Sequence, residues 1–193
     1  VIIIRGFINN NKKVIVCIDA GHGGTDVGAT KENRYEKNDT LKVAKLVREY
    51  LEQENIKVIM TRTDDITCTL QERCKIANKK KADLFVSIHR NSADTGSGIE
   101  TWINSKQNEK DIELATNIMN YLENTKIQND RGIKYGTIKG ENTDYYVLNN
   151  TNMPSCLIEL GFISDDEDNK LFDENIEIYA EAIGNGIIET IKK

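Results

Sequence analysis

The sequence lacks most features that mark fibrous, membrane-spanning and nucleic-acid-binding proteins. It has one proline and 13 glycines in 193 residues, which excludes collagen-like and low-complexity chains. No apolar stretch approaches the roughly 20 residues of a transmembrane helix. The only block of basic residues is 79–81 and the net charge is −5, so nucleic acid is a poor candidate for a partner. We therefore expect one mildly acidic globular domain of ordinary size.

Cysteine motifs and common catalytic motifs are also missing. The four cysteines include no C-x-x-C, which excludes a zinc ribbon and a thioredoxin-type motif. Cys17 and Cys156 lie in apolar runs typical of buried thiols. Cys68 and Cys74 are six residues apart and can either pair or place Cys74 on the core face of a helix. The glycine-rich segment 21–24 lacks the Lys-Ser/Thr of a phosphate-binding loop, and no Gly-x-Ser-x-Gly supplies a serine nucleophile.

The N-terminus predicts a short stub before a single domain. Residues 1–12 are assigned to the stub and residues 13–193 to the domain. The apolar run 1–4 is shorter than the roughly 7–15 residues of a signal-peptide core. It is either the trailing end of an export signal, which we favour, or a short edge strand.

Apolar periodicity predicts alternating strands and helices. Strands are expected at 13–19, 57–61, 82–89, 99–103, 145–148 and 155–160, the fourth of them half-exposed. Helices are expected at 36–54, around 70–77, around 112–122, after a capping box formed by Ser164 and Glu167, and at 176–191. The segment 126–144 has no clear period and is expected to be a functional loop. The alternation predicts a layered α/β domain with a largely parallel sheet that can carry an antiparallel edge.

The only two histidines occupy equivalent positions in this pattern. His22 follows one predicted strand and His89 ends another. Sites in open α/β sheets form beyond the carboxyl ends of the strands, so the two imidazoles are expected to converge. With a carboxylate and a water they can complete a catalytic zinc site. Taken singly, each histidine can instead be a residue with no functional partner, and the matched positions favour the metal.

Two glutamates are the best carboxylate candidates. Glu36 opens the first long helix just after the His22 loop, although an acid there can also simply stabilise the helix N-terminus. Glu159 interrupts the apolar run 156–162, where an unpaired charge costs several kcal/mol. It therefore either pairs with a buried cation or points into a polar cleft, where it is suited to general base catalysis.

Arg62 and Arg73 are assigned a structural role. They flank the acidic pair Asp64-Asp65, and this spacing predicts an ion-pair cluster on the domain.

Several separated stretches resemble the type 3 family of zinc-dependent N-acetylmuramoyl-L-alanine amidases, which are cell-wall hydrolases. The matching stretches are 18–24, 36–37, 70–73, 77–78, 82–89, 146–148, 153–154 and 159–164. They run in the family's order and cover nearly the whole chain from about residue 13. The resemblance implies a single three-layer α/β domain with a twisted, mostly parallel six-stranded sheet flanked by helices.

The resemblance also implies an active site. The family's metal ligands fall on His22, Glu36 and His89, which would hold one Zn²⁺ per chain, and its catalytic glutamate falls on Glu159. The expected reaction is hydrolysis of the amide between N-acetylmuramic acid and L-alanine in peptidoglycan. Arg90 stands where the family usually has a small or apolar residue. It is expected either to clash with the family's usual substrate pose or to bind a carboxylate of the substrate peptide. The alternative is that its side chain turns into solvent or pairs with a nearby acid.

Two other functions remain compatible with the residues alone. A zinc carboxypeptidase of related fold can use a similar ligand set, and a non-catalytic peptidoglycan-binding module can share the fold.

The implied substrate predicts where the protein acts. Peptidoglycan lies outside the cytoplasmic membrane, so the cell envelope or the intermembrane space of a forming spore is expected. A net charge of −5 gives no general attraction to anionic wall polymers, and a targeting or activating protein partner is therefore expected. Spore-cortex members of the family fit this description, and the alternative is a secreted hydrolase whose wall-binding part lies outside this sequence.

Overall fold

A six-stranded sheet forms the centre of the protein. The computed structural model describes residues 13–137 and 143–192, so the predicted stub 1–12 and part of the predicted loop 126–144 lie outside the described residues. The strand order is β4-β1-β5-β8-β6-β7, and β4, β1, β5 and β8 are parallel. Strand β6 pairs antiparallel with β8, and β7 pairs parallel with β6. The strands are β1 Ile15–Ala20, β4 Lys57–Met60, β5 Leu84–Asn91, β6 Ile99–Ile103, β7 Asp130–Tyr135 and β8 Ser155–Phe162.

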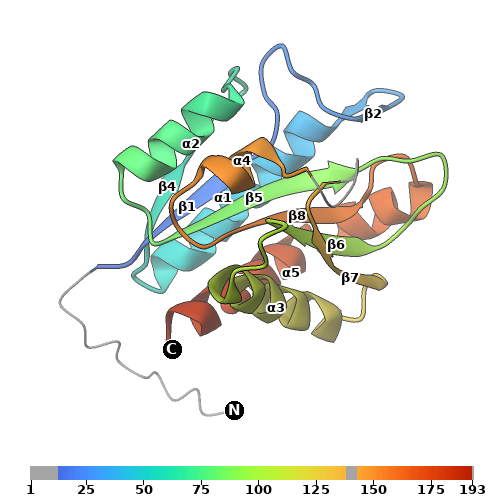
Figure 1. Ribbon diagram of the computed structural model, residues 1–193. Coiled ribbons are helices and arrows are strands. Elements are labelled where there is room, and N and C mark those ends of the chain that lie inside the picture. The colour runs from blue at the N-terminus through green and yellow to red at the C-terminus, as the bar shows by residue number, and fades with distance from the viewer. Residues whose placement is uncertain (1–12, 138–142, 193) are drawn as a thin grey trace.

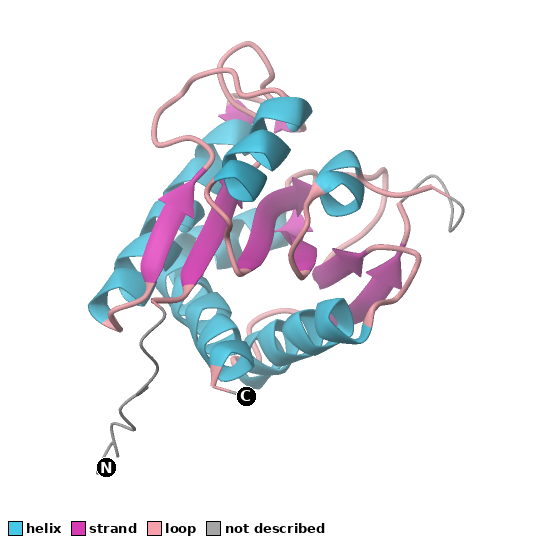
Figure 2. Ribbon diagram, turned by 60° about the vertical axis from the view of Figure 1, so that its left-hand side comes forward, coloured by secondary structure: helices cyan, strands magenta, loops and turns pink. Residues whose placement is uncertain are grey.

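Helices cover both faces of the sheet (Figures 1 and 2). One face carries α1, α3 and α5, and the other carries α2 and α4. A small hairpin of β2 and β3 leads into α1. The bounds are β2 Thr30–Lys31, β3 Arg34–Tyr35, α1 Glu36–Gln53, α2 Leu70–Lys79, α3 Glu109–Asn124, α4 Tyr146–Asn150 and α5 Asp166–Ile191. The predicted three-layer α/β domain with a mostly parallel six-stranded sheet is confirmed.

Strand β1 shows why the central strands are continuous apolar runs. Val16, Ile18 and Ala20 face the larger core with α1 and α5, while Cys17 faces the smaller core with α2. All four are fully buried, as expected for a parallel strand covered on both faces. Burial of each large aliphatic side chain stabilises the fold by about 1.5–3 kcal/mol.

Strands β6 and β7 differ from the sequence prediction. All five residues of β6 are buried, so the expectation of a half-exposed strand is wrong. Trp102 stacks edge-on against Tyr145. Glu100 is only 3% exposed, and its buried carboxylate is satisfied by hydrogen bonds from neighbouring side chains. The segment expected to be a loop contains β7, whose polar composition gave no apolar period. Edge strands with one partner often show this weak pattern.

Two local predictions near the C-terminal half are also wrong. The segment 145–148 forms α4 rather than a strand, with the Leu148 amide bonded to the Tyr145 carbonyl. Four apolar residues are too few to separate a strand from a helical turn by period. Helix α5 is capped by Asp165, which accepts from the Asp168 amide. Ser164, predicted as the cap, instead accepts from the Ala93 amide.

Candidate functional site

Three strands end at the same edge of the sheet and bring the predicted site residues together. His22 follows β1 by two residues, and His89 and Glu159 are register partners on the adjacent strands β5 and β8. Glu36 is the first residue of α1 and reaches the same edge. A crevice of about 570 Å³ opens there, and all four residues line it. This is the position at which open α/β sheets carry their sites.

Two buried arginines hold the loop that presents His22. His22 has a left-handed backbone with φ of 59°, which is costly for a residue other than glycine. Arg73 donates to the carbonyls of Ala20 and His22 at 2.6 Å, and Arg62 donates to the carbonyls of Ala20 and Gly21 at 3.0 and 2.8 Å. The loop carbonyls are therefore satisfied by guanidinium groups, and the strained turn is fixed.

The predicted cluster of Arg62 and Arg73 with Asp64-Asp65 is wrong in its partners. Arg73 forms its ion pair with Asp19 at 2.7 Å, and both side chains are at most 3% exposed. Asp65 pairs instead with Lys37 at 2.7 Å. Arg73 therefore has the expected structural role, but the acid that pairs with it is Asp19 of β1.

Asp19 lies at the centre of the buried hydrogen-bond network beneath the His22 loop. It accepts hydrogen bonds from Thr61 at 2.6 Å, Arg73 at 2.7 Å and Ser87 at 2.7 Å. Burial would raise the pKa of Asp19, but the Arg73 charge and these hydrogen bonds outweigh it and hold the pKa below its ordinary value. The carboxylate therefore links β1, α2 and β5 with the residue that follows β4, beneath the His22 loop.

Replacing Asp19 with asparagine is expected to destabilise the zinc-free protein by about 3–5 kcal/mol at pH 7. The substitution leaves the buried Arg73 guanidinium without its counter-charge, and breaking a buried pair costs that much. Because the pKa is lower in the folded state, the stabilisation is complete above the unfolded value of about 3.9 and is lost as the pH falls through the folded value. Urea unfolding at several pH values measures this, and a variant as stable as wild type at pH 7 would refute it.

Glu36 lies between the two histidines. Its Oε2 is 3.1 Å from His22 Nε2, and its Oε1 is 2.9 Å from His89 Nδ1. The same carboxylate accepts from the backbone amides of Ala29 at 2.8 Å and Arg90 at 2.9 Å. Burial alone would raise the pKa of Glu36, but the two histidines hold it well below its ordinary value. Glu36 is therefore an ionised, fixed carboxylate.

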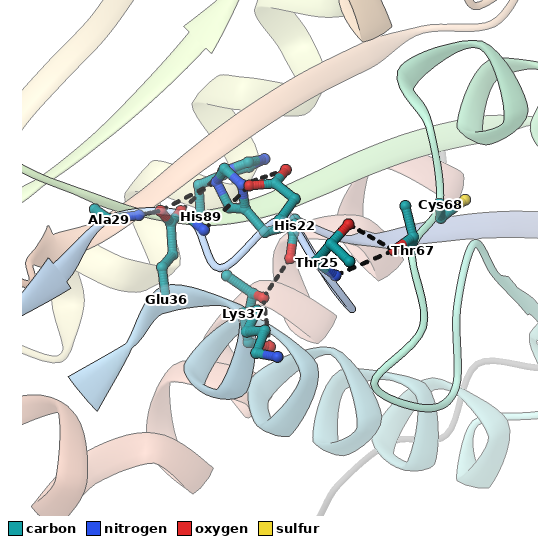
Figure 3. A network of polar contacts seen from close by, with 12 residues as sticks. His22, Thr25, Ala29, Glu36, Lys37, Thr67, Cys68 and His89 are labelled. Atoms are coloured by element: carbon teal, nitrogen blue, oxygen red, sulfur yellow. Dashed lines mark hydrogen bonds and ion pairs between the residues drawn. The ribbon is translucent and has the colours of Figure 1, made fainter. Parts of the chain in front are cut away.

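The three side chains form a compact donor cluster (Figure 3). One ligand atom each from His22, Glu36 and His89 lies within 4.8 Å of the others, and the two rings stand edge to face at 4.9 Å. Gly21 is required beside them, because a Cβ there would overlap the ring of His89. Two imidazole nitrogens and one carboxylate oxygen are the donor set of catalytic zinc sites. The residues therefore fit a zinc ion.

Asp26 is a site residue that the sequence interpretation missed. Its Oδ2 lies 2.9 Å from Nδ1 of His22, the ring nitrogen that does not face Glu36. Burial opposes protonation of His22, but hydrogen bonds with Glu36 and Asp26 outweigh it and raise the pKa. A carboxylate on the outer nitrogen fixes the tautomer of a metal-binding histidine. The spacing of four residues within a glycine-rich loop was the available signal.

Glu159 enters the crevice from β8 and is only 8% exposed. Its Oε2 has no hydrogen-bond partner among the described residues. Burial and the nearby carboxylates of Glu36 and Glu100 raise the pKa of Glu159 well above its ordinary value. A buried, unpartnered carboxyl group with a raised pKa is suited to proton transfer.

Arg90 does not have the geometry expected of a substrate-binding residue, and that prediction is corrected. Its side chain is 1% exposed and pairs with Asp39 at 2.7 Å. It also donates to Asn169 at 2.8 Å and lies over the Phe172 ring, with its central carbon 4.2 Å from the centroid. The guanidinium is thus enclosed between α1 and α5, and it pairs with an acid, which was the other alternative.

The cysteines offer no nucleophile. All four are free, so Cys68 and Cys74 are not paired, and Cys74 lies on the buried face of α2. Burial raises the pKa of Cys74 to about 11. Burial likewise raises the pKa values of Cys17 and Cys156, so these thiols stay protonated near neutral pH.

The fold and the site together define the class of protein. It is an α/β protein with a candidate metal centre of two histidines and one glutamate at the strand ends, beside a second buried glutamate.

Comparison with known proteins identifies the family. The family described as N-acetylmuramoyl-L-alanine amidase matches residues 16–193. The chain therefore belongs to the N-acetylmuramoyl-L-alanine amidase family and is a hydrolase of peptidoglycan amide bonds, which confirms the resemblance carried by the sequence motifs.

Two curated relatives illustrate the range of the family. The uncharacterized protein YqiI of Bacillus subtilis (strain 168) is 41% identical over 176 residues, which cover 89% of this chain and 82% of that protein. The probable cell wall amidase LytH of Staphylococcus epidermidis (strain ATCC 12228 / FDA PCI 1200) is 30% identical over 191 residues, covering 96% of this chain. The chain spans 60% of the length of that relative.

Two solved structures share the fold throughout. The catalytic domain of CwlV, an N-acetylmuramoyl-L-alanine amidase from Bacillus (Paenibacillus) polymyxa var. colistinus, matches with a TM-score of 0.83 and 35% identity, covering 93% of this chain and 98% of that one. The CwlD amidase from Clostridioides difficile, in complex with the GerS lipoprotein, matches with a TM-score of 0.84 and 31% identity over the same shares.

Proposed function

We propose that this protein is a zinc-dependent amidase that cleaves the bond between N-acetylmuramic acid and L-alanine of the peptide stem. His22, Glu36 and His89 would hold one Zn²⁺ per chain, and Glu159 would act as the general base. The observation that carries the proposal is the compact His-Glu-His cluster with Glu159 on the neighbouring strand, in register with His89.

A zinc ion held by His22, Glu36 and His89 would supply Lewis-acid activation of a water and of the scissile carbonyl. Glu159 takes the proton of the attacking water and then donates it to the departing alanine amine. Asp26 and the Ala29 amide keep His22 and Glu36 in position throughout.

The crevice extends from the donor cluster between α2 and α4. Leu70 of α2 and Tyr146 of α4 line it and are 50% and 38% exposed, and Leu157 forms part of its floor. Apolar walls beside Glu159 limit its solvation, which strengthens electrostatic effects on the reacting amide.

The reaction is tested with purified protein and peptidoglycan. Zinc is removed with a chelator and restored in one-equivalent steps, and the digest is analysed by mass spectrometry. We expect peptide stems with a free L-alanine amine and glycan strands without peptide, with activity saturating near one zinc per chain. Release of a C-terminal amino acid would indicate the alternative carboxypeptidase, and binding without any cleavage would indicate a non-catalytic module.

We also propose that the protein acts outside the cytoplasm with help from a protein partner. Its family's substrate lies in the cell envelope, and the related CwlD was solved in complex with a lipoprotein. Within the described ranges, no helix combines the length and the apolar character needed to cross a bilayer. The place of action is proposed as the cell wall or the intermembrane space of a forming spore.

Affinity purification of the full-length protein from its native cells tests this proposal. Recovery of a specific envelope protein supports it, and tight binding to purified walls with no co-purifying partner contradicts it. Parallel digestion of vegetative and spore-cortex peptidoglycan separates the two locations.

A further inference from the structure

We propose that Arg90 is a positioning residue for Glu36, fixing the carboxylate that is proposed above as a zinc ligand. The inference rests on the proposed function, because it concerns the geometry of a proposed ligand. It differs from the substrate-binding role, which was one of the alternatives that the sequence left open for Arg90.

The Arg90 backbone lies against Glu36 where the pairing of β5 with β8 is irregular. His89 pairs with Glu159 and Asn91 pairs with Phe162, so two steps along β5 match three along β8, and the extra residue belongs to β8. Bulges disrupt regular pairing locally and occur near active sites. The Arg90 amide donates to Oε1 of Glu36 at 2.9 Å, the same oxygen that lies 2.9 Å from His89. The residue opposite the bulge thus places an amide donor directly on the proposed ligand.

The side chain of Arg90 anchors that amide. The Arg90 guanidinium pairs with Asp39 at 2.7 Å. Asp39 lies three residues after Glu36, in the first turns of α1, so it is on the same side of the helix. Arg90 therefore contacts α1 at two points, through its amide at Glu36 and through its guanidinium at Asp39. The end of β5 and the start of α1 cannot shift apart without breaking both contacts.

Helix α5 contacts the Arg90 guanidinium on the side away from α1. Arg90 donates to Asn169 at 2.8 Å and lies over the ring of Phe172, a geometry suited to a cation–π contact. Arg34 completes the cluster by bonding Asp39 at 2.7 Å and Asp173 at 2.8 and 2.9 Å. Arg34, Arg90, Asp39 and Asp173 thus join β3, β5, α1 and α5, and this cluster is called the clamp below.

These contacts account for a residue as large as arginine at position 90. A small residue at position 90 would keep the amide contact but lose the anchor at Asp39 and α5. Outer-shell partners of metal ligands typically contribute about 10–100-fold to metal affinity. The Arg90 guanidinium is engaged with Asp39 and its amide with Glu36, so the effect of replacing Arg90 should appear first in zinc affinity.

The test uses the full chain with Arg90→Met, which keeps length and removes the charge, and Arg90→Lys, which keeps a charge for Asp39 but loses the planar fork. Leu122→Ala in α3 is the control, because it destabilises the core at a residue outside the clamp that is 2% exposed. Zinc affinity is measured by competition with a chromogenic chelator, and thermal unfolding is measured on the zinc-free proteins.

We expect Arg90→Met to weaken zinc binding by about 10–100-fold and Arg90→Lys to weaken it less. Leu122→Ala should keep wild-type zinc affinity even where its melting temperature falls further. If Arg90→Met does not fold, a loss of zinc affinity in the folded Arg90→Lys variant carries the same conclusion. Unchanged zinc affinity in the folded Arg90 variants, or an equal loss in Leu122→Ala, would overturn the positioning role alone. A wild-type protein that binds no zinc would overturn both this role and the proposed function.

Discussion

Replacing His89 with alanine is expected to remove both the zinc and the activity. His89 supplies one of three donors in the cluster, and its ring packs directly against Gly21. Two remaining donors, His22 and Glu36, cannot complete a zinc site of three protein ligands. The loss of affinity should exceed the roughly 100-fold that an outer-shell change causes.

Elemental analysis after dialysis measures the zinc content of the His89→Ala variant, and the peptidoglycan digest measures its activity. Ser92→Ala is a suitable control, because Ser92 is exposed at the rim of the same crevice. The control should retain one zinc per chain and full activity. One equivalent of zinc in the His89→Ala variant would refute the assignment of His89 as a ligand.

The parts of the fold that could be predicted from sequence are those with long, regular apolar periods. Strand β5 and helix α1 were found to within a few residues, because their apolar residues recur over several turns or along a fully buried strand. Helix α4 and strand β7 could not be found, since one has five residues and the other is a polar edge strand. In both cases the structure depends on neighbours distant in the chain.

The candidate site was predictable to a similar degree and for a similar reason. His22, His89 and Glu159 stand out because each breaks an apolar or glycine-rich pattern at a strand end. Asp26 does not stand out, and the alternatives for Arg90 could not be separated, since a charged residue in a loop or at a strand terminus has many possible partners. Only the folded structure shows that Asp26 contacts His22, and that the Arg90 side chain pairs with Asp39.

Replacing Glu159 with glutamine is expected to lower kcat by about 10²–10⁴-fold while leaving zinc bound. This range is typical for the loss of a general base, and glutamine is nearly the same size as glutamate but cannot accept the proton. His22, Glu36 and His89 keep their donors in this variant, so zinc content should match wild type. The kcat of the zinc-loaded variant on peptidoglycan is the decisive measurement.

The same substitution is expected to leave stability unchanged or to raise it. The Glu159 carboxyl is buried, and its Oε2 has no partner among the described residues. Burial and the carboxylates of Glu36 and Glu100 raise its pKa above the unfolded value, so ionisation near neutral pH destabilises the fold. Glutamine removes that cost. A gain or no change in melting temperature together with a large loss of kcat would match a group held for catalysis at the expense of stability.

Glu100 provides the matched control for Glu159. It is the register partner of Glu159 on β6 and is also buried, but its carboxylate is fully engaged. It accepts from Asn91 at 2.8 Å, Trp102 at 3.0 Å and Arg131 at 2.8 Å. Glu100→Gln should therefore lower the melting temperature and reduce kcat far less than Glu159→Gln. Near-wild-type kcat in the zinc-loaded Glu159→Gln variant, or an equal kcat loss in both variants, would contradict the assignment of Glu159 as the general base.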